Sequence, residues 1–115
     1  MVKKTFTLLD GLQVGDGPVH KEVVLRDLRA GDVIEATEDA ERAYTTEDGK
    51  ISIAASPTRV GMLILIKRIE KLGDLQMPLT EAEFKKLTLR DMNLINKMAD
   101  EQEAQTALAA RGRGD

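Results

Sequence analysis

The sequence predicts an α+β fold in which short antiparallel β-hairpins pack against a central helix and the C-terminal region is helical. Two observations predict the hairpins: β-favouring segments flank a Gly- and Pro-containing turn at 15–18, and others flank an Asp-Gly pair within 44–53. A third observation predicts the helices, because apolar residues recur at helical spacing from residue 56 onward. A two-stranded hairpin is only marginally stable alone, so both hairpins should lie against the central helix.

The first predicted hairpin joins strands at 4–9 and 19–25 through the turn G-D-G-P. The second of these strands shows the alternation of apolar and polar residues that is typical of a half-buried strand. A helix over 33–43 is expected next, because Asp32 can cap its first turn. Glu35 stands three residues later, as a capping box requires.

The central helix is predicted over 56–72. Ser56 can accept a hydrogen bond from the first turn, Pro57 suits the first helical position, and Gly73 is a natural stop. One apolar stripe runs along its whole length and consists of Met62, Leu65, Ile66, Ile69 and Leu72. The opposite face ends in a basic patch of Lys67, Arg68 and Lys71.

Two further helices are predicted after this one. Thr80 and Glu83 form a capping-box pattern that starts a short helix through Leu87, and Thr88 caps a longer helix that continues to about residue 110. The apolar face of the longer helix consists of Leu89, Met92, Ile95, Met98 and Ala99. Residues 111–115 are expected to form a flexible tail.

Length and composition favour one small domain. No linker or repeat divides the 115 residues, so 1–110 should form a single unit, β-rich over 1–55 and helical over 56–110. The net charge of −3 and the 3% aromatic content argue against nucleic acid as the main partner. The absence of cysteine excludes disulfides and thiolate sites. Without a signal peptide or a long apolar run, the protein is expected to be soluble and intracellular.

Residues suited to catalysis or metal binding are few and poorly arranged. His20 is the sole histidine, and Ser52 and Ser56 are the sole serines. Ser56 is better explained as a helix cap and His20 as the outward residue of a strand than as parts of a hydrolytic triad. The carboxylates between residues 32 and 48 lack the spacing of a calcium loop. We therefore expect no enzymatic activity, no cofactor and no metal.

Apolar surface is the remaining candidate for function. The first turns of the central helix are apolar all round, so either the protein's own domain or a partner must cover them on two sides. Methionine adapts to irregular partners, and Met62, Met92 and Met98 would suit a groove for another helix. The alternative is that these faces simply pack on one another and on the sheet. The predicted partner-binding residues are Val60, Leu63, Ile64, Met92, Ile95 and Met98.

Three segments carry a resemblance to a known family. They are V-V-L-R-D-L-R-A-G-D at 23–32, the helix that begins S-P and ends I-K-R-I-E-K-L-G-D-L, and L-T-E-A-E-F-K-K-L-T-L-R-D-M-N-L-I at 79–95. From the first strand to about Ala99, the chain resembles the small tail assembly chaperones of Mu-like contractile-tailed phages and prophages. The matching motifs are structural rather than catalytic.

The resemblance implies a non-enzymatic protein that binds the long, hydrophobic, helical tape measure protein and keeps it soluble until tail tube subunits polymerise around it. It implies action in the bacterial host cytoplasm and absence from the mature virion. The tail tube subunits are a further candidate partner, whereas nucleic acid and membranes are not expected. Spare apolar surface also makes a homo-oligomer an expectation. The alternative function is a small structural or adaptor protein that is retained in the phage tail.

Overall fold

The computed structural model describes residues 3–114, apart from the side chains of Tyr44 and of residues 109–114. It contains a three-stranded sheet, a two-stranded sheet and four helices, so the prediction of an α+β fold is confirmed. Strands β1 (Lys4–Gln13) and β2 (Val19–Leu25) pair antiparallel as the predicted first hairpin. Strand β1 runs beyond the expected end at residue 9 because an irregularity between Thr7 and Leu12 lets pairing resume after the bulge.

The third strand of this sheet corrects the predicted central helix. Helix α2 spans Pro57–Arg68, and the next residues form strand β5 (Ile69–Leu72), which pairs antiparallel with β2. A register shift places both Ile69 and Leu72 in the core, where they are 3% and 0% exposed. A helix continued over these residues would leave the backbone groups of the β2 edge without partners. The expected stop, Gly73, has a φ of +54° and follows the strand instead.

Both predicted signals at the start of α2 are confirmed. The Oγ of Ser56 accepts a hydrogen bond from the backbone N–H of Arg59 at 3.5 Å, and Pro57 occupies the first helical position. At the other end of the helix, the predicted basic patch is wrong for one residue. Arg68 is 2% exposed and donates to Gln102 Oε1 at 2.5 Å and to Glu103 Oε1 at 2.7 Å, so it joins α2 to the last helix.

Helix α1 spans Ala30–Ala40, which is earlier than the predicted 33–43. Asp32 is not the N-cap; it stands in the first turn and accepts hydrogen bonds from the backbone N–H of Arg29 at 2.9 Å and from both terminal nitrogens of Arg26 at 2.8 Å. Glu35 takes no part in a capping box and binds Lys67 of α2 at 3.1 Å. The helix ends at Ala40 because the next residues pair as a strand.

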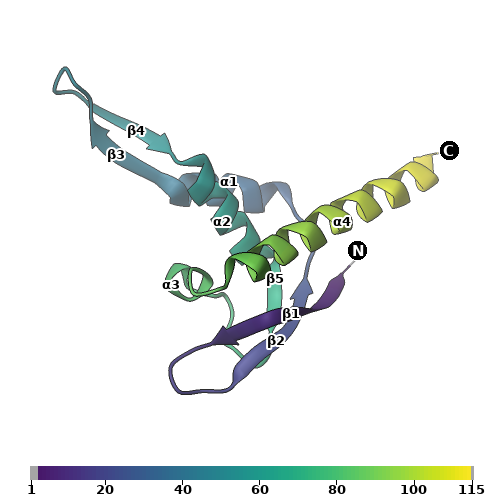
Figure 1. Ribbon diagram of the computed structural model, residues 1–115. Helices are drawn as coiled ribbons and strands as arrows, with labels where there is room; N and C mark the ends of the chain where they lie inside the picture. Colours follow the sequence, from purple (N-terminus) through teal and green to yellow (C-terminus); the bar gives the residue numbers. More distant parts are fainter. Residues whose placement is uncertain (1–2, 115) are drawn as a thin grey trace.

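The second predicted hairpin is confirmed. Strand β3 (Glu41–Thr45) pairs antiparallel with strand β4 (Ile51–Ala55), and Gly49 in the turn has a φ of +85°. The prediction that this hairpin lies against the central helix is wrong, because it projects past the ends of α1 and α2 (Figure 1). The Cα radius of gyration, 16.6 Å, exceeds the roughly 13 Å expected for a compact chain of this length, in keeping with projecting segments.

The short helix α3 (Glu81–Phe84) begins with the predicted capping box. Thr80 N–H donates to the Glu83 carboxylate at 2.9 Å, and Glu83 N–H donates to the Thr80 hydroxyl at 3.1 Å. The helix ends before the predicted Leu87. Thr88 caps helix α4 (Leu89–Gly114) as predicted, accepting from Asp91 N–H at 3.3 Å. The flexibility predicted for 111–115 stays untested: the helix includes 111–114, and Asp115 lies outside the described residues.

A buried carboxylate fixes α4 to the sheet. Asp91 is 0% exposed, and its side chain accepts the consecutive backbone N–H groups of Leu9 (2.7 Å), Asp10 (3.1 Å) and Gly11 (2.9 Å) at the irregular part of β1. Such a run of N–H groups is a natural anion-binding concavity. The neighbouring Arg90 guanidinium and the Thr88 hydroxyl bind Asp10 and hold the pKa of that carboxyl well below its usual range.

The ion pair between Asp32 and Arg26 leads to a prediction about acid stability. The Arg26 guanidinium lowers the pKa of Asp32 to about 2, from an ordinary 3.8. The stabilisation is therefore complete above about pH 4 and disappears as the pH falls through 2. Because Arg26 is partly exposed, we expect Asp32→Asn to lower the free energy of unfolding by about 1–2 kcal/mol at pH 7.

Urea unfolding of Asp32→Asn and the unchanged chain, measured from pH 7 down to pH 2, checks this expectation. The difference between the two proteins should shrink toward zero at the acid end of the series. Asp39→Asn, at an exposed position on the same helix, is the matched control. A difference that is independent of pH would contradict the role given to the ion pair.

Candidate functional site

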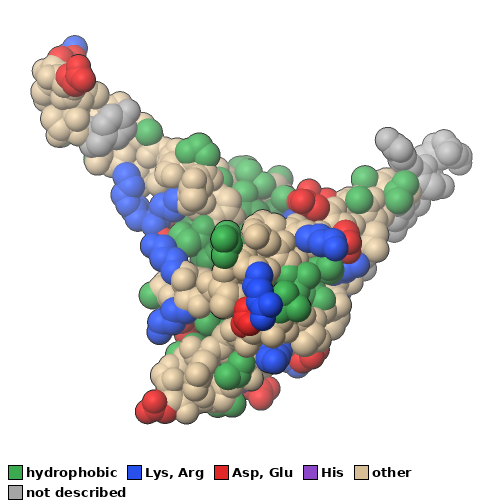
Figure 2. All heavy atoms as spheres, in the orientation of Figure 1, with side chains coloured by type: hydrophobic (Ala, Val, Ile, Leu, Met, Phe, Trp, Pro, Cys, Tyr) green, Lys and Arg blue, Asp and Glu red, His purple; other side chains and the backbone are tan. Residues whose placement is uncertain are grey.

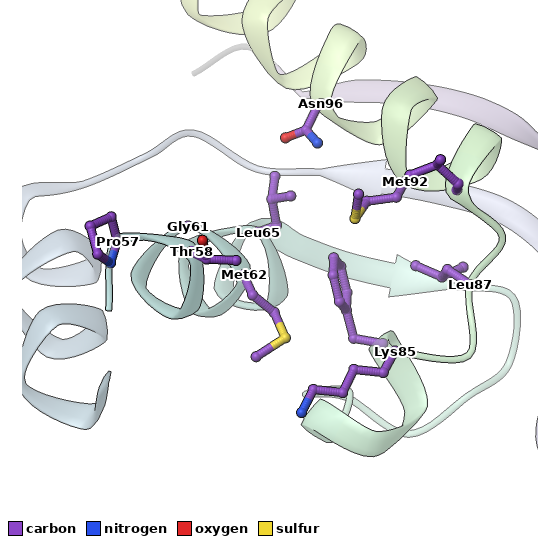
Figure 3. Close-up of a pocket in the computed structure, with 11 residues that line it drawn as sticks. Pro57, Thr58, Gly61, Met62, Leu65, Lys85, Leu87, Met92 and Asn96 are labelled. Atoms are coloured by element: carbon purple, nitrogen blue, oxygen red, sulfur yellow. The ribbon is translucent and has the colours of Figure 1, made fainter. Parts of the chain in front are cut away.

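A largely apolar groove of about 560 Å³ lies between α2, α3 and the beginning of α4 (Figure 3). We call it the α2–α4 groove. Leu65 and Phe84 form its buried base, at 8% and 4% exposed. Met62 and Met92 extend into it from α2 and α4. The complete lining is Pro57, Thr58, Gly61, Met62, Leu65, Phe84, Lys85, Leu87, Leu89, Met92 and Asn96.

Local sequence explains how these side chains meet. On α2, Thr58, Gly61, Met62 and Leu65 recur at spacings of three and four, which places them on one face of the helix. Gly61 keeps this face open, because a Cβ built there would meet no atom within 4 Å. The capping box of α3 and the Thr88 cap of α4 fix the turn that brings the other lining residues opposite this face.

Among the described residues, the lining of the α2–α4 groove carries one charged side chain, and it is basic. No acidic side chain is among its lining residues in the described part of the chain, and Lys85 stands at its mouth (Figure 3). Arg59 lies at the side of the groove, and its guanidinium binds the Glu81 carboxylate at 2.5 and 3.0 Å, joining α2 to α3. Figure 2 shows blue Lys and Arg side chains, with red carboxylates among them, close to green apolar ones on this face of the molecule.

The structure distributes the six predicted partner-binding residues over several surfaces. Met92 lines the α2–α4 groove. Ile95 is 0% exposed and belongs to the core, so it offers a partner no surface. Leu63 and Met98 are half-buried against the same core. The remaining two, Val60 and Ile64, lie on the face of α2 that also carries Lys67. Because Lys67 binds Glu35 of α1, this face of α2 is turned toward α1.

Sequence reasoning therefore named two of the groove's residues as suitable for a helix, Met62 and Met92, and missed the rest of the lining. The signal that could have found the groove is Gly61. It stands among large apolar residues of a predicted helix, although glycine is a poor helix former, so another reason for a glycine at this position should be sought. Leu87 and Leu89, on either side of the Thr88 cap, were a second signal. Which of these residues contact a partner stays a prediction.

The polar residues considered for chemistry have structural surroundings. The Nδ1 of His20 accepts a hydrogen bond from Asp74 N–H at 3.2 Å, and its ring packs where a Gly73 side chain would lie. Ser56 is a helix cap, as predicted. In the part of the chain that the structure describes, no three His, Cys, Asp or Glu side chains lie together as metal ligands would. Nor does any described helix have the length and apolarity needed to cross a membrane.

Comparison with known proteins identifies relatives over almost the whole chain. The model of a family described as "Tail assembly protein gp41" matches residues 8–115. "Probable tail assembly protein gp41" of Escherichia phage Mu is 34% identical over 112 residues, and the match covers 92% of this chain and 77% of that protein. "Mu-like prophage FluMu protein gp41" of Haemophilus influenzae is 33% identical, over 91% of this chain and 84% of its own length.

A longer phage Mu protein, "Probable tail assembly protein FS-gp41", is 33% identical, and the match covers 91% of this chain but 58% of that relative. No solved structure shows a significant match to this chain. The family model and the relatives together confirm the resemblance drawn from the sequence segments. The chain belongs to the family of tail assembly proteins found in phage Mu and Mu-like prophages.

Proposed function

We propose that this protein is a non-enzymatic tail assembly chaperone whose α2–α4 groove holds apolar helical segments of the tape measure protein while the tail tube forms. Membership of a family named for tail assembly supports the general role. On this proposal the protein acts in the host cytoplasm and is released as tube subunits replace it, so it is absent from the finished particle.

The observation that carries the proposal is the composition and shape of the α2–α4 groove. Its volume of about 560 Å³ is within the range of about 300–1,000 Å³ that is typical of ligand sites. Its lining consists mainly of apolar side chains, with two flexible methionines placed on different helices. Because a thioether side chain adapts to different shapes, such a groove suits a partner that presents many similar but unequal apolar segments.

An amphipathic helix is the occupant that these features favour. A helix places large apolar side chains at spacings of three and four on one face, and such a face is the usual partner of an apolar groove between helices. Since Lys85 stands at the mouth and the lining has no acidic side chain, a helix with carboxylates beside its apolar face would fit best. A long helical protein without a core of its own would also be kept from aggregating by this contact.

Co-expression with the tape measure protein encoded in the same phage genome tests the proposal. We expect the tape measure protein to be soluble only when this chain is present, and the two to elute together. The control is expression of each protein alone. A tape measure protein that is insoluble in both cases, or soluble without help, would overturn the chaperone proposal.

Mass spectrometry of purified phage particles separates this proposal from its main rival. A chaperone should be absent from particles although it is abundant in the lysate. A structural or adaptor protein would be present in particles in a fixed ratio to the tube subunits. Detection of that fixed ratio would favour retention in the tail over release.

A further inference from the structure

The β3–β4 hairpin exposes apolar side chains and an unpaired strand edge at the same place. It extends away from the rest of the fold at the upper left of Figure 1. On β4, Ile51 is 78% and Ile53 is 66% exposed, and they share one face of the hairpin. No strand other than β3 pairs with β4 in the described residues. Two strands alone are marginally stable in water, so this hairpin lacks the cover that such a ribbon needs.

The free edge of β4 also lacks the features that keep strand edges from pairing. Proteins usually place charged side chains, proline or bulges along such an edge. The β4 sequence I-S-I-A-A has no charged residue and no proline, and its ladder with β3 runs without a bulge from Glu41↔Ala55 to Thr45↔Ile51. The edge is therefore free to accept another strand.

The alternation of hydrogen-bonded and non-hydrogen-bonded residue pairs along the hairpin shows which backbone groups point outward. Thr46 N–H donates to the Lys50 carbonyl at 2.8 Å, which makes these two residues a hydrogen-bonded pair. Hydrogen-bonded and non-hydrogen-bonded pairs alternate in an antiparallel ladder. Ile51, Ile53 and Ala55 consequently direct their N–H and C=O groups away from β3, toward the free edge.

From this geometry we propose that β4 is a self-association site, at which two copies of the chain pair their β4 strands antiparallel about a two-fold axis at Ile53. This register sets Ile53 opposite Ile53 of the second copy, and Ile51 opposite Ala55. The residues that are brought together are the same residues whose backbone groups point outward, so every outward group on both strands gains a partner. The product is a four-stranded sheet with the isoleucines adjacent on one face.

The distribution of charge favours a second copy as the occupant of this edge. Charged residues of the hairpin lie only at its two ends, so the middle of β4 carries no charge that would repel an identical strand. The turn is acidic on balance, with Glu47, Asp48 and Lys50, whereas the charges of Glu41 and Arg42 at the base cancel. Figure 2 shows red side chains together with a blue one at the tip of the hairpin. Antiparallel pairing places the acidic turn of each copy beside the base of the other and keeps the two turns apart, so like charges do not meet across the pair.

An introduced cysteine tests the register directly, because the natural chain has none. In a hydrogen-bonded antiparallel pair the Cα atoms are about 5.5 Å apart, within the range of about 4.4–6.8 Å that disulfides span. We expect Ile53→Cys to form a disulfide-linked dimer under mild oxidation. Ile51→Cys, which is more exposed on the same strand, should not, because each copy of that position faces Ala55 of the other. Equal cross-linking of the two variants, or none with Ile53→Cys, would overturn the proposal.

Sedimentation over a concentration series tests the same pairing without cross-linking. The unchanged chain should associate to a dimer, and Ile53→Lys should weaken association by about tenfold or more, because it sets two like charges directly opposite each other. Ala54→Lys adds the same charge on the other face of β4 and should leave the dimer intact, since its neighbour across the axis is Ser52. Circular dichroism should show unchanged folding in both variants. A chain that is monomeric throughout the series, or one that associates equally as Ile53→Lys, would show that β4 pairs with no second copy.

Discussion

Replacement of Asp91 by Asn is expected to lower the free energy of unfolding by about 3 kcal/mol, measured by urea denaturation at pH 7. The carboxylate is 0% exposed and accepts N–H groups from three consecutive residues of β1. An amide has a single acceptor oxygen and turns its NH₂ group toward the remaining N–H donors. Buried donors without an acceptor cost about 1–3 kcal/mol each, so losing more than one of these hydrogen bonds accounts for the expected change.

Asp100→Asn is the matched control for this prediction, because Asp100 is an exposed residue of the same helix. The same chemical change there should alter stability by less than about 0.5 kcal/mol. The Asp91 variant should also lose protection from hydrogen exchange at Leu9, Asp10 and Gly11 before the rest of β1 opens. If Asp91→Asn were as stable as the control, the carboxylate would not be what fixes α4 to the sheet.

Replacement of Gly61 by Glu is expected to weaken tape measure binding by at least about tenfold, or about 1.4 kcal/mol, while the protein stays folded. The new side chain would begin at the open wall of the α2–α4 groove, where a Cβ meets no atom within 4 Å. It would place a carboxylate in the space proposed for apolar side chains of the partner, which then could not be buried without cost. Because glycine is a poor helix former, the substitution should not destabilise α2.

Two control variants separate a blocked groove from other effects of the change. Gly31→Glu introduces the same residue at an exposed helical glycine of α1 that also has no atom within 4 Å, and it should bind normally. Gly61→Ala leaves the groove open and should keep binding, with stability raised by up to about 1 kcal/mol. These variants test the groove more cleanly than charges at Leu63 or Ile64, which are half-buried and would disturb packing. Normal binding by folded Gly61→Glu would place the partner elsewhere on the protein.

The sequence predicted the kind of site, an apolar groove for a partner helix, but not which residues line it. Both methionines of the groove were noted from the sequence as suited to a partner helix, yet Ile95, at the same helical spacing as Met92, is a core residue. Helical periodicity identifies an apolar face but does not say how much of that face the domain's own sheet will cover. Here β1 and β2 cover the side of α4 that carries Ile95 and Ala99, and Met92 is left at the edge.

The sequence by itself determined the features that depend on neighbouring residues. Ser56-Pro57, Thr80 with Glu83, and the Asp48-Gly49 turn each specify a helix start or a reversal through hydrogen bonds and φ angles within a few residues. These interactions are local, so they can be predicted without knowing where the rest of the chain lies. The α+β class followed from them.

Only the tertiary structure decided the features that depend on distant residues. Ile69–Leu72 became a strand because β2, more than 40 residues earlier, offered an unpaired edge. Asp91 is buried because three N–H groups of β1, some 80 residues earlier, donate hydrogen bonds to its carboxylate. In each case a residue's local preference was weak, and a long-range hydrogen bond or ion pair outweighed it, since buried polar groups must be paired.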